Sequence, residues 1–382
     1  MEFLLTIFLV SLLPGQLGGI SFAPTVTVYI HDMMLVVLLL IGSFWVLKKK
    51  KAVQPKLLLP IAAFLVAGVL SLAANALKFR LPELFEASLY LIRFAAYAGL
   101  YWLLVQGFVS ANVVSTRLFW VGVGISVLGF IQYRWYPDLR NLSYLGWDPH
   151  YFRLFSTLLD PNYAGIIIVL TFLLGLYLLE KKQSFVIVAG EAMNCIALYL
   201  TYSRSAYLAF VLSLFTYIVM RKQWRLVLVV LAFVGALLII PKMGNTQTLT
   251  RSVSSVARIG NWQESFVLIA QAPIFGHGFD TLRYVHKAAG SPSSAVSKAA
   301  AGVDSSVLFI LATTGIIGFV AYAWMMISWV KRQPNAMTVA VLVALLSHSL
   351  FNNSLFYPWV VIWFWVFVAS EELETYRLNV GR

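Results

Sequence analysis

The sequence is poor in charge and in cysteine. Only 11% of its 382 residues are charged, 15 of them are acidic, and Cys195 is the one cysteine. Hydrophobic residues make up 60% of the chain, more than the core of a soluble fold of this length could bury. A lone cysteine excludes an intrachain disulfide. The composition therefore predicts a membrane protein rather than a soluble domain.

Two further features are absent. No nucleic-acid motif accompanies the net charge of +13, and the basic residues lie in short loops between apolar runs. Membrane topology and lipid phosphate explain such loops, so no nucleic-acid partner is expected. The first twenty residues also lack the basic start and small-residue cleavage pattern of a secretory signal. We interpret them as a first span.

A spanning helix needs about twenty mostly apolar residues. Stretches of this kind predict an all-α, polytopic transmembrane helix bundle of about twelve spans, with membrane lipids as its surroundings. The expected spans are 3–20, 26–47, 57–74, 88–108, 117–136, 161–179, 184–202, 205–220, 226–241, 305–330, 336–353 and 357–370.

The loops that carry Lys48–Lys51, Lys181, Arg221 and Lys331 fall on the same side as both termini. By the positive-inside rule this side is the cytoplasm. The sequence thus predicts a multi-pass protein of the cytoplasmic (inner) membrane with both termini cytoplasmic.

The outer side is also basic, which the rule does not predict for short loops. We expect an anionic ligand there, although single arginines can also extend to lipid headgroups. The outer basic residues are Lys78, Arg80, Arg134, Arg140, Arg153, Arg204, Arg251, Arg258 and Arg283.

One long extracytoplasmic loop, residues 242–304, separates two expected spans. Its apolar spacing predicts an amphipathic helix over 254–270, capped by Ser254 or Ser255 and ended by Pro273. Arg258 and Trp262 are four residues apart, so both lie on one stripe and Arg258 should face the bilayer or the mouth of the bundle. The Gly, Ser and Ala-rich residues 288–302 are expected to be mobile.

Two short outer segments could bind an anion or an acceptor. Asp160 precedes Pro161 at the start of a span, which is the usual arrangement of a helix cap, and Asn162 follows. Arg204 lies in the tight turn Thr201–Ser205 before the next span. An arginine at a helix N-terminus is well placed to bind a phosphate bidentately.

Other polar residues lie within or beside spans. Arg93 needs a partner or a cavity inside the membrane, and either a donor diphosphate or Glu191 would provide one. Asp32, His31 and His348 are expected to have satisfied packing roles. Asp304 could cap the next span. His277 and His286 are the loop groups that titrate near neutral pH.

Five segments together resemble the O-antigen ligase and Wzy polymerase family. They are Asp160–Gly165, the Thr-Tyr-Ser-Arg turn ending at Arg204, Arg258 with Trp262, the PIFGHG run Pro273–Gly278, and Asp304–Gly318. The resemblance implies three parts: N-terminal transmembrane helices at 1–154, an O-antigen ligase-like core at 155–330, and C-terminal transmembrane helices with a cytoplasmic tail at 331–382.

The resemblance implies a glycosyltransferase of the GT-C type that works at the outer face without a cofactor, metal or nucleotide sugar. Its donor would be an undecaprenyl-diphosphate-linked oligosaccharide and its acceptor a glycan or lipid. The family's two diphosphate-binding arginines map onto Arg204 and Arg258. A family histidine that is proposed to activate the acceptor maps onto Asp304, and a carboxylate can also accept a proton. This departure favours a glycan polymerase or a ligase-like transferase.

A secondary transporter or a lipid-linked-glycan flippase is the alternative, since twelve spans and a basic cavity also suit an anion carrier. Transporters commonly consist of two repeated halves with broken helices at the midplane. No such repeat is evident here, and the polar residues gather at the outer ends of the expected spans.

Overall fold

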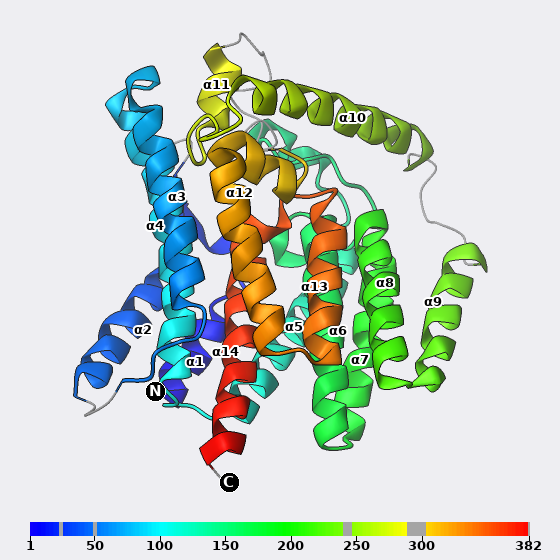
Figure 1. Ribbon diagram of the computed structural model, residues 1–382. Helices are drawn as coiled ribbons and strands as arrows, with labels where there is room; N and C mark the ends of the chain where they lie inside the picture. The colour runs from blue at the N-terminus through cyan, green and yellow to red at the C-terminus, as the bar shows by residue number, and fades with distance from the viewer. Residues whose placement is uncertain (23–25, 49–51, 240–246, 289–302, 381–382) are drawn as a thin grey trace.

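The protein is a bundle of helices that run up and down between two ends (Figure 1). The computed structural model describes residues 1–22, 26–48, 52–239, 247–288 and 303–380. The helices are α1 (Glu2–Val10), α2 (Ile30–Leu47), α3 (Leu58–Ala74), α4 (Leu81–Val105), α5 (Ala111–Trp135), α6 (Pro161–Lys181), α7 (Phe185–Thr201), α8 (Arg204–Arg221), α9 (Val227–Ile239), α10 (Gln247–Gln271), α11 (Leu282–Ala288), α12 (Ser306–Arg332), α13 (Ala336–Ser349) and α14 (Pro358–Val380). The strands are β1 (Gly19–Ser21) and β2 (Thr27–Tyr29).

Five of these helices are long and apolar enough to cross a membrane, namely α2, α4, α5, α6 and α12. The stretches Leu58–Ala74, Phe185–Thr201, Trp224–Ile239 and Ala336–Ser349 are shorter and also apolar. Large apolar side chains such as Leu40 and Leu47 on α2, and Leu231 and Leu238 on α9, are exposed on the outside of the bundle. Lipid would cover them, and the structure is that of a multi-pass membrane protein. The number of spans, about twelve, stays a prediction.

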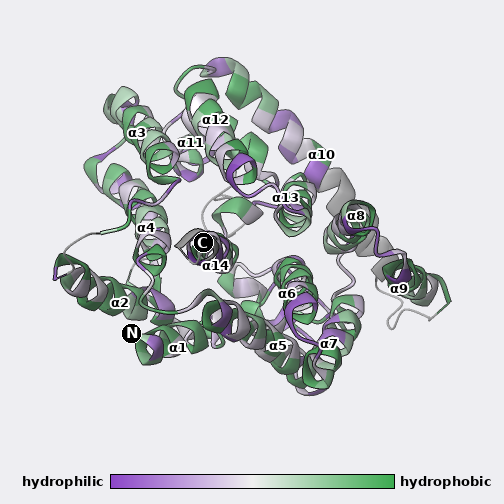
Figure 2. Ribbon diagram, turned by 60° about the horizontal axis from the view of Figure 1, so that its bottom comes forward, coloured by the Kyte–Doolittle hydropathy of each residue, from purple (hydrophilic) through white to green (hydrophobic). Residues whose placement is uncertain are grey.

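The arrangement has two different ends. Both chain termini lie at one end, and α10 and α11 lie across the other (Figure 1). We refer to the end with α10 as the outer end. In the view of Figure 2, α14 runs through the middle of the bundle. Its residues from Trp359 to Ala369 are all buried, so this helix is enclosed by protein on every side.

The expected first span, 3–20, is not a continuous helix. α1 ends at Val10, and Gly15 has φ +60° and packs so closely on the Thr157 backbone that a Cβ would lie 2.3 Å from its carbonyl oxygen. Residues Gly19–Ser21 then pair antiparallel with Thr27–Tyr29. Sequence hydropathy missed this because a run of apolar residues does not by itself distinguish a helix from short strands.

The long loop is also more structured than expected. α10 begins at Gln247 rather than near Ser254, and it ends at Gln271 before Pro273, as the sequence predicted. It crosses the outer end of the bundle (Figure 1), and Trp262 and Ile269 pack on a small core that contains Phe309. The segment expected to be mobile lies mostly outside the described residues.

The helix α12 is broken at Gly315, which has φ +62°. The PIFGHG segment fills the break: the amide of His277 donates to the carbonyl of Ala312 at 2.9 Å, and that of Ile316 donates to Pro273 at 2.9 Å. Ser71 of α3 also donates to the carbonyl of Thr313 at 2.6 Å. Protein therefore satisfies the polar groups that the break exposes, which a membrane interior requires.

Candidate functional site

Three helices begin side by side near the outer end, and each has a side-chain cap. The carboxylate of Asp160 accepts from the amides of Asn162 and Tyr163 at the start of α6, which confirms the predicted cap. Ser203 caps α8 and Ser305 caps α12. The first turn of each helix presents partly positive amide groups, so converging N-termini favour a bound anion.

A chain of hydrogen bonds holds these N-termini together. Ser203 Oγ donates to Asn162 Oδ1 at 2.8 Å, and Asn352 Nδ2 donates to Ser205 Oγ at 2.9 Å. Ser306 Oγ in turn donates to the carbonyl of Asn352. The helices α6, α8 and α12 are thus joined through the turn after α13, and their relative positions are fixed by buried polar groups.

Arg204 is the first residue of α8, as predicted, and it is exposed. Its neighbours Ser203 and Ser205 belong to the hydrogen-bonded chain just described. The backbone of Arg204 is therefore fixed at the junction of α6 and α8, and its side chain is exposed.

Arg258 of α10 and Asp304 lie at the same site. The charge of Arg258 acts on Asp304, Asp148 and His348. Burial raises the pKa of Asp304, and the nearby Arg258 opposes that rise. Arg258 therefore faces the mouth of the bundle, which is one of the two directions, bilayer or mouth, that its spacing with Trp262 allowed.

Asp304 does not cap the helix, contrary to one expectation. Ser305 does so, and the Asp304 amide donates to Asn261 Oδ1 of α10 at 3.0 Å. The Asp304 carboxylate is thus available for another role.

Arg93 has a different partner from the one suggested by sequence. Its guanidinium forms an ion pair with Asp32 at 3.0 Å and donates to the carbonyl of Thr27. Glu191 instead lies against Gly175, and neither of its oxygens has a hydrogen-bond partner in the part of the chain that the structure describes. The predicted Arg93–Glu191 pair is wrong because α2, which carries Asp32 in its first turn, packs against α4, and β2 places the carbonyl of Thr27 beside the same guanidinium.

The remaining polar candidates have structural partners. His31 lies 3.3 Å from the Tyr97 hydroxyl, and His348 lies 2.6 Å from Ser354 Oγ, as expected of satisfied residues. His277 contacts the carbonyl of Leu268 through Nε2 at 2.9 Å, and burial lowers its pKa. The charges that act on His277 are those of Lys78 and His286.

Sequence reasoning missed an acidic and basic group in the loop between α5 and α6. One side-chain atom from each of Asp148, His150 and Asp160 lies within 4.8 Å of the other two. Arg153 donates through Nε to the carbonyl of Thr201 at 2.9 Å and so ties this loop to the turn of Arg204. The cluster DPHYFR, residues 148–153, was the only local signal, and no periodicity marks it.

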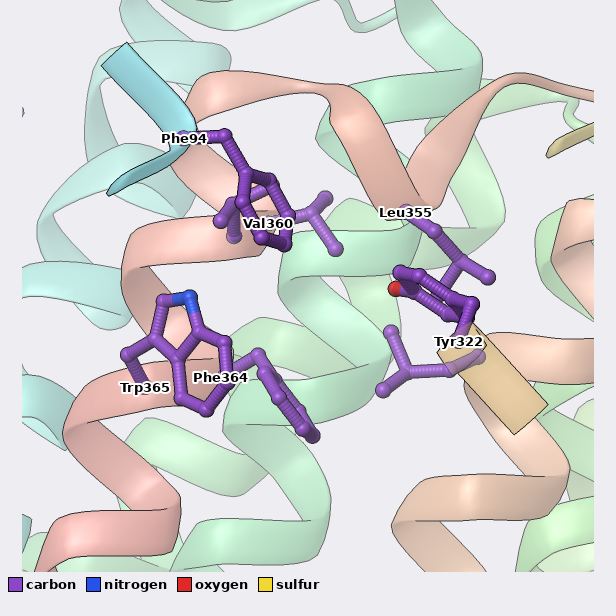
Figure 3. Close-up of a pocket in the computed structure, with 8 residues that line it drawn as sticks. Phe94, Tyr322, Leu355, Val360, Phe364 and Trp365 are labelled. Atoms are coloured by element: carbon purple, nitrogen blue, oxygen red, sulfur yellow. The ribbon is translucent and has the colours of Figure 1, made fainter. Parts of the chain in front are cut away.

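A small cavity inside the bundle is a different feature. It lies between α4, α12 and α14 and is lined by Phe94, Tyr322, Leu345, Leu355, Val360, Val361, Phe364 and Trp365 (Figure 3). Apart from the phenol of Tyr322 and the indole of Trp365, these side chains are apolar. The cavity lacks the charges that a phosphate needs, so we place the candidate site at the outer helix N-termini.

Part of the chain matches a known protein family. Residues 189–323 match the family model for O-antigen ligase, Wzy_C. No curated protein matches the chain. The matched segment contains Arg204, Arg258 and Asp304 and ends beyond the break in α12, whereas Asp160 lies before it. Over residues 189–323, the chain is therefore similar to the O-antigen ligase, or Wzy-like, family.

Proposed function

We propose that the protein is a metal-independent glycosyltransferase of the GT-C type. It would transfer or polymerise an undecaprenyl-diphosphate-linked glycan at the outer face of the cytoplasmic membrane. The observation that carries this proposal is the position of Arg258 beside the capped N-termini of α6 and α12. Arginine and helix N-termini are the groups that bind diphosphates.

The chemistry follows from charge. When the bond between the sugar C1 and the phosphate oxygen breaks, negative charge grows on the diphosphate. A guanidinium group fixed nearby stabilises that charge more in the transition state than in the bound donor. In this proposal Arg258 and Arg204 fill that role, since arginine stays protonated at any physiological pH. Arg93, committed to Asp32, would act on the donor only indirectly.

The acceptor must lose a proton as it attacks. We assign this step to Asp304, whose carboxylate lies within range of the charge of Arg258. Its raised pKa improves it as a proton acceptor, because a carboxylate with a higher pKa is a stronger base than an unperturbed one. The acceptor oxygen would form its bond to C1 as the diphosphate leaves with the bonding electron pair.

Purified protein in nanodiscs, incubated with lipid-linked repeat units alone, tests the proposal. A polymerase yields a ladder of longer lipid-linked glycans, and a ligase yields product only when a second acceptor is added. The alternative, a transporter or flippase, predicts that labelled lipid-linked glycan crosses a liposome bilayer with no new glycosidic bond. That result would refute the enzyme.

A further inference from the structure

The loop between α5 and α6 is held in place by hydrogen bonds and by a small hydrophobic core. Asp138 and Tyr151 form a β-bridge, and the amide of Leu139 donates to the carbonyl of His150 at 2.8 Å. Gln132 Oε1 accepts from the amide of Phe155 at 2.9 Å. Leu139 and Phe155 are fully buried in a small core of their own. The loop therefore holds its side chains in fixed positions, as a binding site requires.

The same loop contains strained backbone. Phe152, Ser156 and Leu159 have φ values of 47°, 53° and 55°. Residues other than glycine rarely adopt such backbone angles. Each such residue costs roughly 1–3 kcal/mol, and such residues concentrate at functional sites. These three strained residues lie in the sequence between His150 and Asp160.

One ring nitrogen of His150, Nε2, has no hydrogen-bond partner among the described residues. Arg153 Nη1 lies 3.4 Å from His150 Nδ1, and because arginine can only donate, Nδ1 accepts. Burial and the charge of Arg153 also hold the pKa of His150 well below its usual value, so the ring is neutral. The proton of the neutral ring is then on Nε2. That atom is buried and has no partner among the described residues.

Among the described residues, only one oxygen of the Asp160 carboxylate accepts hydrogen bonds. Oδ1 accepts from the Asn162 amide at 2.6 Å and from the Tyr163 amide at 3.3 Å. Oδ2 has no hydrogen bond to any residue that the structure describes. Asp148 provides a second carboxylate, and Arg153 acts electrostatically on both. Asp148 and Asp160 therefore offer two carboxylate acceptors, and His150 offers one buried donor.

We propose that Asp148, His150 and Asp160 form a subsite that binds the acceptor sugar through its hydroxyl groups. This rests on the transferase proposed above, whose acceptor is a glycan. Sugar hydroxyls donate to the carboxylates, and the Nε2–H of His150 donates to a sugar oxygen. Two groups bonded to one hydroxyl oxygen lie about 4.5 Å apart at ordinary hydrogen-bond lengths. One ring nitrogen of His150 and one carboxylate oxygen from each of Asp148 and Asp160 lie within 4.8 Å of one another, which is close enough for the three side chains to bind the same sugar.

A divalent cation is the competing occupant, since carboxylates and a histidine are also metal ligands. Two features weigh against it. A metal needs a lone pair on His150, but the contact with Arg153 places the proton on the buried Nε2. The positive charges of Arg153 and Arg258 already act on Asp148. A neutral sugar needs no further positive charge at this point.

The test measures sugar binding with no donor present. Saturation-transfer-difference NMR is run on the full chain in nanodiscs, because maltoside detergents carry sugars themselves. The probes are glucose, galactose, N-acetylglucosamine and rhamnose. We expect the wild-type protein to give signals from at least one probe. Asp160→Asn, which still caps α6, and Asp148→Asn should each weaken binding by roughly ten- to a hundredfold, the worth of a hydrogen bond to a charged group.

Asp138→Asn is the matched control, because Asp138 is an acid of the same loop whose carboxylate pairs with Arg140 at 2.7 Å. It should bind sugar as the wild-type does. Absence of signal from every probe, or equal loss in the control, overturns the subsite. Tight Mn²⁺ binding that disappears in Asp160→Asn would overturn it in favour of a cation. Because no donor is used, sugar binding without glycan transfer would refute only the transferase, and transfer without sugar binding only the subsite.

Discussion

Gly315 of α12 lies against Ile274 of the PIFGHG segment with no room for a side chain between them. A Cβ on Gly315 would come within 2.2 Å of the carbonyl oxygen of Ile274. The reverse contact is equally close, since a Cβ on Gly276 would lie 2.3 Å from the carbonyl carbon of Thr313. Both glycines also have positive φ. The backbones of the outer loop and the broken helix are thus in direct contact.

Gly315→Ala and Gly276→Ala should each destabilise the protein. The unfavourable φ alone costs roughly 1–3 kcal/mol, and the clash with backbone adds to it. Thermal unfolding in detergent, followed by size-exclusion chromatography, measures the effect. Gly260→Ala is the control, because a Cβ there meets nothing within 4 Å and Gly260 lies inside α10, where alanine is favoured. Equal stability of all three variants would contradict the close contact.

Arg204→Ala and Arg258→Ala should each lower glycan transfer by roughly two to three orders of magnitude, the usual effect of removing one charge-stabilising donor. Lysine at either position should restore transfer only in part, because it lacks the bidentate fork. Initial rates with lipid-linked donor measure this. Arg140→Ala should be neutral, since Arg140 is exposed and paired with Asp138. Near-wild-type turnover in either test variant would remove that arginine from the diphosphate site.

Asp304→Asn should lower transfer by roughly two to four orders of magnitude while donor binding stays unchanged, as expected for loss of a general base. The start of α12 is not affected, because Ser305 and not Asp304 caps it. Rates and donor affinity are measured on the same preparation. A loss smaller than tenfold would show that Asp304 orients the acceptor and does not take its proton.

Transfer should rise with pH through about 6. Burial and the charge of nearby Asp148 raise the pKa of Asp160. Arg153 and the Asn162 and Tyr163 amides oppose the rise, and the resulting pKa is about 6. The carboxylate that binds sugar hydroxyls is the form present above that pKa. The acceptor KM should therefore fall between pH 5 and 7, and Asp160→Asn should lose that dependence. An unchanged profile in the variant would assign the titration to another group.

The raised pKa of Asp160 also makes stability depend on pH. Stability should fall as the pH rises, whereas glycan transfer should increase. The pKa of folded Asp160, about 6, lies above its unfolded value of 3.8. The folded state therefore binds more protons between these values, and the contribution of Asp160 to stability decreases as pH rises from about 4 to 6. Unfolding of wild type and Asp160→Asn across this range checks the direction.

The orientation of the chain can be tested with single cysteines in a Cys195→Ala background. Gln263 of α10 and Lys182 after α6 are both exposed and lie at opposite ends of the bundle. A membrane-impermeant maleimide should label Gln263→Cys in intact cells and Lys182→Cys only after lysis. The reverse pattern would place the site in the cytoplasm and remove the case for a lipid-diphosphate donor.

The sequence by itself determined the features that depend on local composition and spacing. Long apolar stretches specify membrane helices because lipid accepts no unpaired backbone. The cap at Asp160, the helix start at Arg204 and the end of α10 before Pro273 follow from residues within one turn of each boundary. The spacing of Arg258 with Trp262 limited its direction to the bilayer or the mouth of the bundle.

Only the tertiary structure decided which distant residues meet. Asp32 became the partner of Arg93 because α2 packs against α4, and no local pattern in the sequence specifies which helices pack together. Ser305 and not Asp304 caps α12, since Asn261 of α10 holds the Asp304 backbone. The grouping of Asp148, His150 and Asp160 depends on a strained loop with no periodic pattern. Contacts of this kind arise from packing between elements, and the order of residues along the chain does not encode them locally.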